Sequence, residues 1–164
     1  YLFKGTVEEN LKMAKPDATK EEMEAVLQKV NLLGFLQTQD GLQTQLLEKA
    51  SNLSGGQCQR LVIARALLRT DSAVYIFDEA ASNIDVESEE LIMNVIHELA
   101  KTKTVLLISH RLANVVKSDK IYFLKDGEIK ESGKHDELMS QNGAYRHLYE
   151  SQMALENYGK GGMA

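Results

Sequence analysis

Apolar residues follow a helical period over much of the N-terminal part of this chain. One stripe, at spacings of three and four, consists of Met23, Val26, Leu27 and Val30. Helix starts are indicated by Ser or Thr, because a hydroxyl can accept a hydrogen bond from a free backbone N–H of the first turn. On this basis we expect N-caps at Thr6, Thr19 and Ser54. The pattern predicts a mostly helical segment up to about residue 70.

Two continuous apolar runs interrupt this helical pattern. Val74–Phe77 and Thr104–Ser109 are short and rich in β-branched or aromatic residues, which is typical of strands buried on both faces in a parallel sheet. Asp78 and Glu79 directly follow the first run, and His110 follows the second. Because ligands bind at the carboxyl ends of strands in open α/β sheets, these three side chains predict a metal–nucleotide site at one sheet edge.

The remaining pattern completes the predicted organisation. A helix capped by Asp85 is expected between the two strands, and this alternation of strand and helix over 73–118 predicts a parallel α/β layer. Asp126-Gly127 lies between apolar runs and predicts a β-hairpin, which two helices should follow at about 135–140 and 143–154. The expected divisions are a helical subdomain at 1–70, an α/β part at 71–155 and a disordered tail at 156–164.

Composition narrows the class of function. The chain has 164 residues and a formal net charge of −5, which gives no electrostatic basis for binding nucleic acid or an anionic membrane. A single cysteine, Cys58, excludes an internal disulfide and favours a reducing environment. The apolar runs are too short to span a bilayer. These properties predict a soluble globular domain on the cytosolic side of a cell.

Two groups of residues could carry chemistry. Asp78 could hold Mg²⁺ through water and Glu79 could act as a general base, although an Asp-Glu pair after a strand is also typical of a solvated turn. Ser54-Gly55-Gly56-Gln57 would leave backbone N–H groups open at a helix N-terminus, where anions bind. A flexible glycine turn explains the same residues equally well, so the residues alone leave both alternatives open.

Four stretches resemble the motifs of ABC ATPases, in the order and spacing of that family. Leu53–Gln57 is similar to the signature motif, and Ile76–Ala80 resembles Walker B with its catalytic glutamate. Ser82–Asp85 resembles the D-loop, and Ser109–Leu112 resembles the H-loop. The resemblance covers about residues 1–152, and Leu2–Thr6 resembles exporter-type members in particular.

The phosphate-loop pattern G-x-x-x-x-G-K-[ST] does not occur in the sequence. The resemblance therefore implies the C-terminal part of the nucleotide-binding domain of an exporter-type ABC transporter. Its expected fold is a truncated P-loop NTPase, with a RecA-like parallel sheet and helices, the ABC helical subdomain and a C-terminal β-hairpin. Alone, such a chain is expected neither to hydrolyse ATP nor to bind it tightly.

The resemblance also implies roles for individual residues. Asp78 would hold Mg²⁺ through water, Glu79 would polarise the attacking water, and His110 would contact the γ-phosphate of ATP. The signature residues would face ATP bound to the other subunit of a head-to-tail dimer; they are Ser54, Gly55, Gly56 and Gln57. Ser82 and Asp85 would line the seam of that dimer. An aspartate at position 56 is expected to block dimer closure, because its carboxylate would face the partner's γ-phosphate.

The implied whole protein couples ATP hydrolysis to export at the cytoplasmic face of the cell membrane. Its partners would be a second nucleotide-binding domain and a transmembrane domain, and no nucleic acid. A soluble ABC-type ATPase of DNA maintenance or translation is the alternative. Without a neighbouring strand, the edge of 104–109 would be open, so the chain is also expected to self-associate there.

Overall fold

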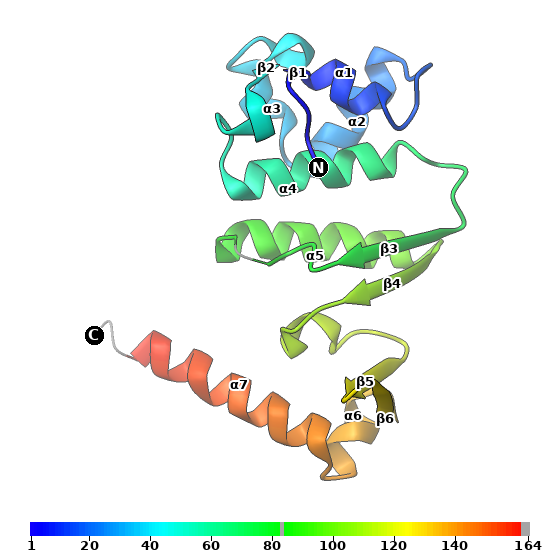
Figure 1. Cartoon of the computed structure of the whole chain (residues 1–164), viewed down its shortest axis with the longest axis vertical. Helices are drawn as coiled ribbons and strands as arrows, with labels where there is room; N and C mark the ends of the chain where they lie inside the picture. Colours follow the sequence, from blue (N-terminus) through cyan, green and yellow to red (C-terminus); the bar gives the residue numbers. More distant parts are fainter. Residues whose placement is uncertain (83, 162–164) are drawn as a thin grey trace. The chain divides into compact units, whose positions relative to one another are not determined.

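A computed structural model describes residues 1–82 and 84–161 (Figure 1). The α-helices are α1 (Val7–Lys12), α2 (Lys20–Lys29), α3 (Leu33–Gln37), α4 (Gly55–Leu67), α5 (Val86–Ala100), α6 (His135–Ser140) and α7 (Ala144–Gly161). The strands are β1 (Gly5–Thr6), β2 (Gln45–Leu46), β3 (Val74–Asp78), β4 (Thr104–Ile108), β5 (Ile121–Lys125) and β6 (Glu128–Gly133). Short 3₁₀ helices are η1 (Gly41–Gln43), η2 (Glu48–Ala50) and η3 (Leu112–Val115).

The local signals in the sequence define these elements closely. Thr6 and Thr19 both cap their helices, and each exchanges hydrogen bonds with the glutamate three residues later. In the turn between β5 and β6, Asp126 has φ 54° and Gly127 has φ 76°. Positive φ at both central residues is the geometry of a type I′ turn, whose twist suits an antiparallel hairpin. The predicted hairpin is therefore confirmed.

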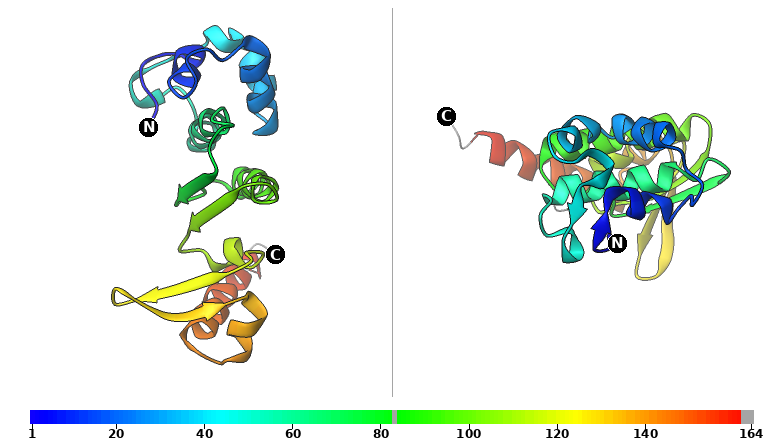
Figure 2. Two further views of the ribbon diagram at one scale, coloured as in Figure 1. Left: turned by 90° about the vertical axis from the view of Figure 1, so that its right-hand side faces the viewer. Right: turned by 90° about the horizontal axis from the view of Figure 1, so that it is seen from above.

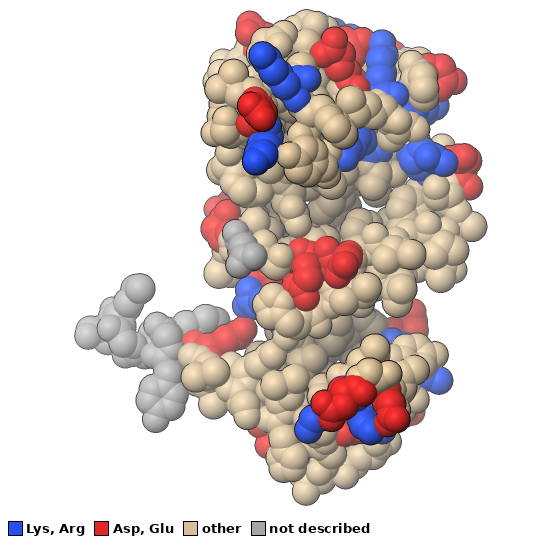
Figure 3. All heavy atoms as spheres, viewed as in Figure 1, with Lys and Arg blue, Asp and Glu red and all other residues tan. Residues whose placement is uncertain are grey.

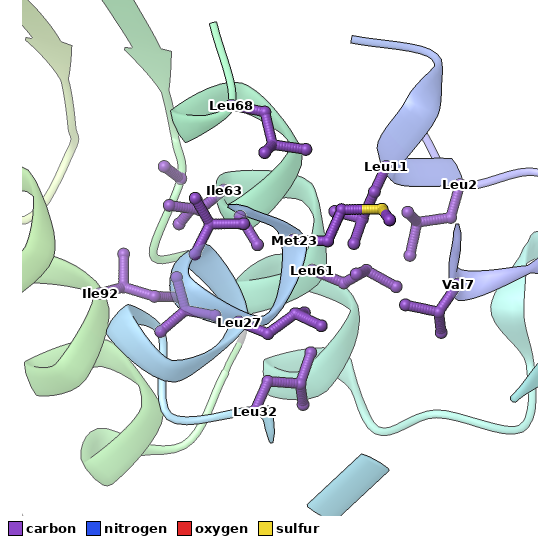
Figure 4. Close-up of a cluster of buried hydrophobic side chains, with 14 of the residues drawn as sticks. Leu2, Val7, Leu11, Met23, Leu27, Leu32, Leu61, Ile63, Leu68 and Ile92 are labelled. Atoms are coloured by element: carbon purple, nitrogen blue, oxygen red, sulfur yellow. The ribbon is translucent and has the colours of Figure 1, made fainter. Parts of the chain in front are cut away.

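The chain forms two compact units, Tyr1–Ile108 and the segment from Ser109 onward. The sequence placed its division after residue 70 instead. The first unit extends further because α4 contributes Leu61 and Ile63 to the same hydrophobic core as Phe77 and Ile92, from β3 and α5. Figure 4 shows this cluster, with Leu61 close to side chains of α1 and α2 and Ile63 towards Ile92.

Strands β3 and β4 pair in parallel, with Val74 opposite Thr104 and Asp78 opposite Ile108. Figures 1 and 2 show α5 lying along one face of this pair. Tyr75 and Phe77 point into the core, but Ile76 on the opposite face is 65% exposed. The other exposed large apolar side chains of that face are Val74, Leu106 and Ile108. The prediction of burial on both faces is thus wrong for the described residues, because the helices that pack on the sheet cover only one face.

The second unit contains η3, the β5–β6 hairpin, α6 and α7. Tyr145 is fully buried and packs edge-on against Phe123, with 6.2 Å between ring centroids. A carboxylate oxygen of Glu131 accepts hydrogen bonds from the N–H groups of Ala144 and Tyr145, which fixes the start of α7. The helix then runs to Gly161, although a disordered tail was predicted from residue 156. Residues 162–164 lie outside the described residues.

Helix α7 continues because its sequence has no proline and no glycine before Gly159, so nothing interrupts the backbone ladder. Within residues 1–82 and 84–161, no helix combines the length and the apolar composition that crossing a membrane requires.

Candidate functional site

The N-terminus of α4 carries the signature residues. Ser54 is its N-cap: the Ser54 hydroxyl accepts a hydrogen bond from Gln57 N (3.2 Å), and Ser54 N donates to the Gln57 side chain (2.8 Å). Ser54 and Gly55 are exposed to solvent. The first N–H groups of a helix lack intrahelical partners and carry a partial positive charge. This end of α4 is therefore suited to an anionic ligand.

Gly56 differs from Gly55 because it is buried. A Cβ atom at position 56 would lie 2.3 Å from Ser88 Oγ and 3.2 Å from Asp85 Oδ2. A side chain there would therefore point into its own chain. This contact gives Gly56→Asp a second effect beside the expected one at the partner's γ-phosphate, because the added side chain would also collide with Ser88 and approach Asp85.

The turn after β3 places Asp78 and Glu79. Asp78 is the last residue of the strand and is exposed, whereas Glu79 adopts a left-handed backbone conformation with φ 51°. The Glu79 N–H donates to Ile108 O (3.0 Å), at the carboxyl end of β4. Glu79 O accepts from both the N–H (3.1 Å) and the hydroxyl (2.8 Å) of Ser82. Hydrogen bonds on both sides of Glu79 thus hold a conformation that non-glycine residues seldom adopt.

The signature helix also contacts this turn. Gln59 Nε2 donates to Glu79 O at 3.4 Å, a long hydrogen bond that joins α4 to the residue after Walker B. Gln59 was not among the residues predicted from the sequence. It lies two residues beyond the signature motif, and only the packing of α4 beside β3 reveals its partner. The body of the signature helix therefore contacts the turn that carries Glu79 within one chain.

Asp85 is the N-cap of α5, as predicted: its Oδ1 accepts a hydrogen bond from Ser88 N at 2.8 Å. Hydrogen bonds from the Ser88 backbone and side chain lower the pKa of Asp85, with a smaller contribution from the charge of Arg60. Ser82 and Asp85 thus lie at the two ends of the predicted D-loop, one bonded to Glu79 and the other to α5. Asn83, between them, lies outside the described residues.

His110 belongs to the second unit, two residues after β4 ends, and is exposed. Its backbone oxygen accepts a hydrogen bond from Gln152 Nε2 (2.7 Å), and Leu112 N donates to Gln152 Oε1 (2.9 Å). A salt bridge between Arg111 and Glu156 (3.0 Å) adds a further link to α7. Helix α7 therefore fixes the backbone around His110.

Among the predicted site residues of the first unit, the structure places Gly56 next to Asp85 and bonds Ser82 to Glu79. Across the described residues, no group of three or more His, Cys, Asp or Glu side chains is arranged to hold a metal ion. Asp78, a hard oxygen ligand at the end of β3, fits Mg²⁺ held mainly by water and nucleotide, since Mg²⁺ binds proteins through only one or two carboxylates. Parallel strands with an acidic carboxyl end, and a separate glycine-bearing helix N-terminus, are together typical of a nucleotide-binding α/β domain.

Comparisons with known proteins agree with this class. A family model described as ABC transporter matches residues 2–82. An ABC transporter ATP-binding protein of Haemophilus influenzae is 53% identical over 156 residues, 95% of this chain and 28% of that protein. An ATP-dependent lipid A-core flippase of Mannheimia succiniciproducens is 44% identical over 154 residues, 93% of this chain and 26% of that protein. A solved structure of a bacterial Atm1-family ABC exporter with ATP bound has a TM-score of 0.84 and 30% identity, covering 92% of this chain and 26% of that one.

The chain therefore belongs to the ATP-binding domains of ABC transporters, and to their exporter type. It spans about a quarter of the length of the relatives that it matches. The predicted α/β fold of an ABC domain, with its parallel strands and C-terminal hairpin, is confirmed by the structural match.

Proposed function

We propose that the full-length protein is an ABC exporter that couples ATP hydrolysis to transport across a membrane, and that this chain supplies one set of its nucleotide-site residues. The observation that carries the proposal is the turn at Glu79. This acidic residue stands at the carboxyl end of β3 in a strained conformation, held by β4, Ser82 and the signature helix. Backbone strain that several neighbours maintain is typical of active sites.

Within one subunit, Asp78 would bind Mg²⁺ through water, and the ion supplies charge neutralisation at the β- and γ-phosphates when bound. Glu79 follows Asp78 and would orient the attacking water and accept its proton. His110 would contact the γ-phosphate, with its backbone fixed by Gln152.

The signature residues would act on ATP bound to a second nucleotide-binding domain in a head-to-tail dimer. The exposed end of α4 supports this assignment, since Ser54 and Gly55 are accessible and Gln57 is half-buried. Gly56 would contribute its backbone N–H, although its missing side chain serves packing inside its own chain. Ser82 and Asp85 would line the same seam.

A transmembrane domain would be the other partner, which places the protein at the cytoplasmic face of the cell membrane. Relatives named as a lipid A-core flippase and as multidrug export proteins favour transport over a soluble ATPase of DNA maintenance or translation. Figure 3 shows basic and acidic side chains interspersed over the N-terminal helices on the face in view. Together with the net charge of −5, this surface does not favour nucleic-acid binding.

The test is Glu79→Gln in the full-length protein, with Glu90→Gln as a matched control on the exposed side of α5. Glutamine keeps the shape and the backbone bonds of Glu79 but cannot accept the proton. We expect magnesium-dependent ATP turnover to fall by about 100-fold or more, while nucleotide binding and the control stay at wild-type level. Turnover of Glu79→Gln close to the wild-type rate would refute the assigned role.

A further inference from the structure

Gly56 packs directly against Ser88 of its own chain. A Cβ at position 56 would lie 2.3 Å from Ser88 Oγ and 2.8 Å from Ser88 Cβ. Rotation of the serine side chain can move Oγ, but it cannot move Cβ, whose position the backbone of α5 determines. Any residue larger than glycine at position 56 therefore pushes the start of α4 away from the start of α5.

Ser88 is in turn bound to the cap of α5. It is 6% exposed, and its N–H donates to Asp85 Oδ1 at 2.8 Å. The other carboxylate oxygen of Asp85 lies 3.2 Å from the same Cβ position on Gly56. The second signature glycine, the buried serine and the carboxylate at the end of the D-loop thus form one packed contact.

Arg60 holds the glycine from the side of α4. Its Nε donates to Gly56 O at 3.3 Å, and its Nη1 donates to Asn31 O at 3.2 Å, just beyond α2. The arginine charge also lies close enough to Asp85 to act on that carboxylate. Arg60 therefore holds the backbone of Gly56, and Ser88 occupies the space where a Cβ atom at position 56 would lie.

We propose that Ser88 is a positioning residue that locks the signature helix to the cap of the D-loop. This inference rests on the proposed function, in which Ser54–Gln57 and Asp85 both face the dimer seam. When nucleotide contacts the start of α4, any shift of this helix end also shifts Asp85, because the start of α4 and the start of α5 keep a constant spacing. Position 56 requires glycine because Ser88 leaves no room for a side chain, whatever the Gly56 backbone N–H contributes to ATP bound by the partner.

The first experiment is a kinetic cycle in the full-length protein with Gly56→Ala, Ser88→Gly and the double variant. Gly34→Ala serves as control, because nothing lies within 4 Å of the Cβ position on Gly34 in α3. Gly56→Ala should lower kcat for ATP about tenfold, which corresponds to about 1.4 kcal/mol. The double variant should recover most of that loss, and KM should change by less than about twofold. A double variant no faster than Gly56→Ala would overturn the proposal, since the loss would then not arise from the contact with Ser88.

A second measurement separates this inference from the proposed function. Urea unfolding of the chain itself follows the same variants without any ATP. Gly56→Ala should lower the midpoint, and it should cost less in the Ser88→Gly background than alone, because residues in contact are non-additive. If the wild-type protein hydrolyses no ATP, the proposed function fails, and the unfolding cycle still decides the contact. Additive effects of the two substitutions would overturn it.

Discussion

The backbone of Glu79 offers a test of strain at the proposed active site. Its φ of 51° lies in the left-handed region, which costs a non-glycine residue about 1–2 kcal/mol. Alanine and glycine both remove the carboxylate, so any contact made by the side chain is lost equally in Glu79→Ala and Glu79→Gly. The difference between the two variants reports on the backbone alone.

The Glu79→Gly variant should be more stable to unfolding than the Glu79→Ala variant. It relieves the strain of about 1–2 kcal/mol, but it has about 0.5–1 kcal/mol more conformational entropy to lose on folding than alanine. At the middle of both ranges, the free energy of unfolding of Glu79→Gly should therefore exceed that of Glu79→Ala by about 0.75 kcal/mol. The matched control is Ala25→Gly, at an exposed position inside α2, where glycine should cost about 1 kcal/mol. The sign of the alanine-to-glycine change is thus opposite at the two positions.

Urea unfolding followed by circular dichroism measures both differences. With a slope of about 2 kcal/mol per molar urea, the midpoint of Glu79→Gly should exceed that of Glu79→Ala by about 0.4 M. Both variants should lack ATP turnover in the full-length protein, because neither has a base. A midpoint for Glu79→Ala equal to or above that of Glu79→Gly would show that Glu79 stores no strain.

Two further predictions concern acid stability and self-association. Asp85 has a lowered pKa, so its charge stabilises the fold fully above the unfolded pKa of about 3.9, and this effect is lost as the pH falls through the lower folded pKa. Wild type and Asp85→Asn should therefore differ in unfolding midpoint at pH 6 and converge in strong acid. A difference that stays constant with pH would count against this prediction. Strand β4 pairs only with β3 among the described residues, beside an exposed apolar face, so sedimentation velocity of the chain should show association that rises with concentration. Ile76→Glu should abolish this association, whereas Val86→Glu, equally 65% exposed but on α5, should not; a concentration-independent monomer would contradict the prediction.

Much of the fold could be predicted because its signals are local. The N-caps at Thr19 and Ser54 depend on residues three positions away, and the hairpin depends on Asp126-Gly127. The parallel strand pair followed from two apolar runs of the right length. Exposure of one strand face could not be predicted, because an apolar run is the same whether one face or both are covered.

In the candidate site too, some features follow from local sequence signals and others depend on tertiary packing. Asp78 and the N-cap role of Asp85 follow from their places at the ends of a strand and a helix. The strain at Glu79 and its bond from Gln59 depend on how α4 packs on β3, which no local pattern encodes. Ser88 gave no signal at all, because a serine in the first turn of a helix is ordinary until its neighbour is known.

The two signature glycines show why a motif can hide distinct physical requirements. Gly55 is exposed, so its environment does not prevent a ligand from reaching the backbone N–H groups at the start of α4. The Cβ position of Gly56 is occupied by Ser88, so a requirement for glycine there arises inside the chain as well. Loss of activity on substituting Gly56 therefore cannot by itself be assigned to lost contact with a nucleotide. A rescue by Ser88→Gly is what separates packing within one subunit from recognition of ATP in the other.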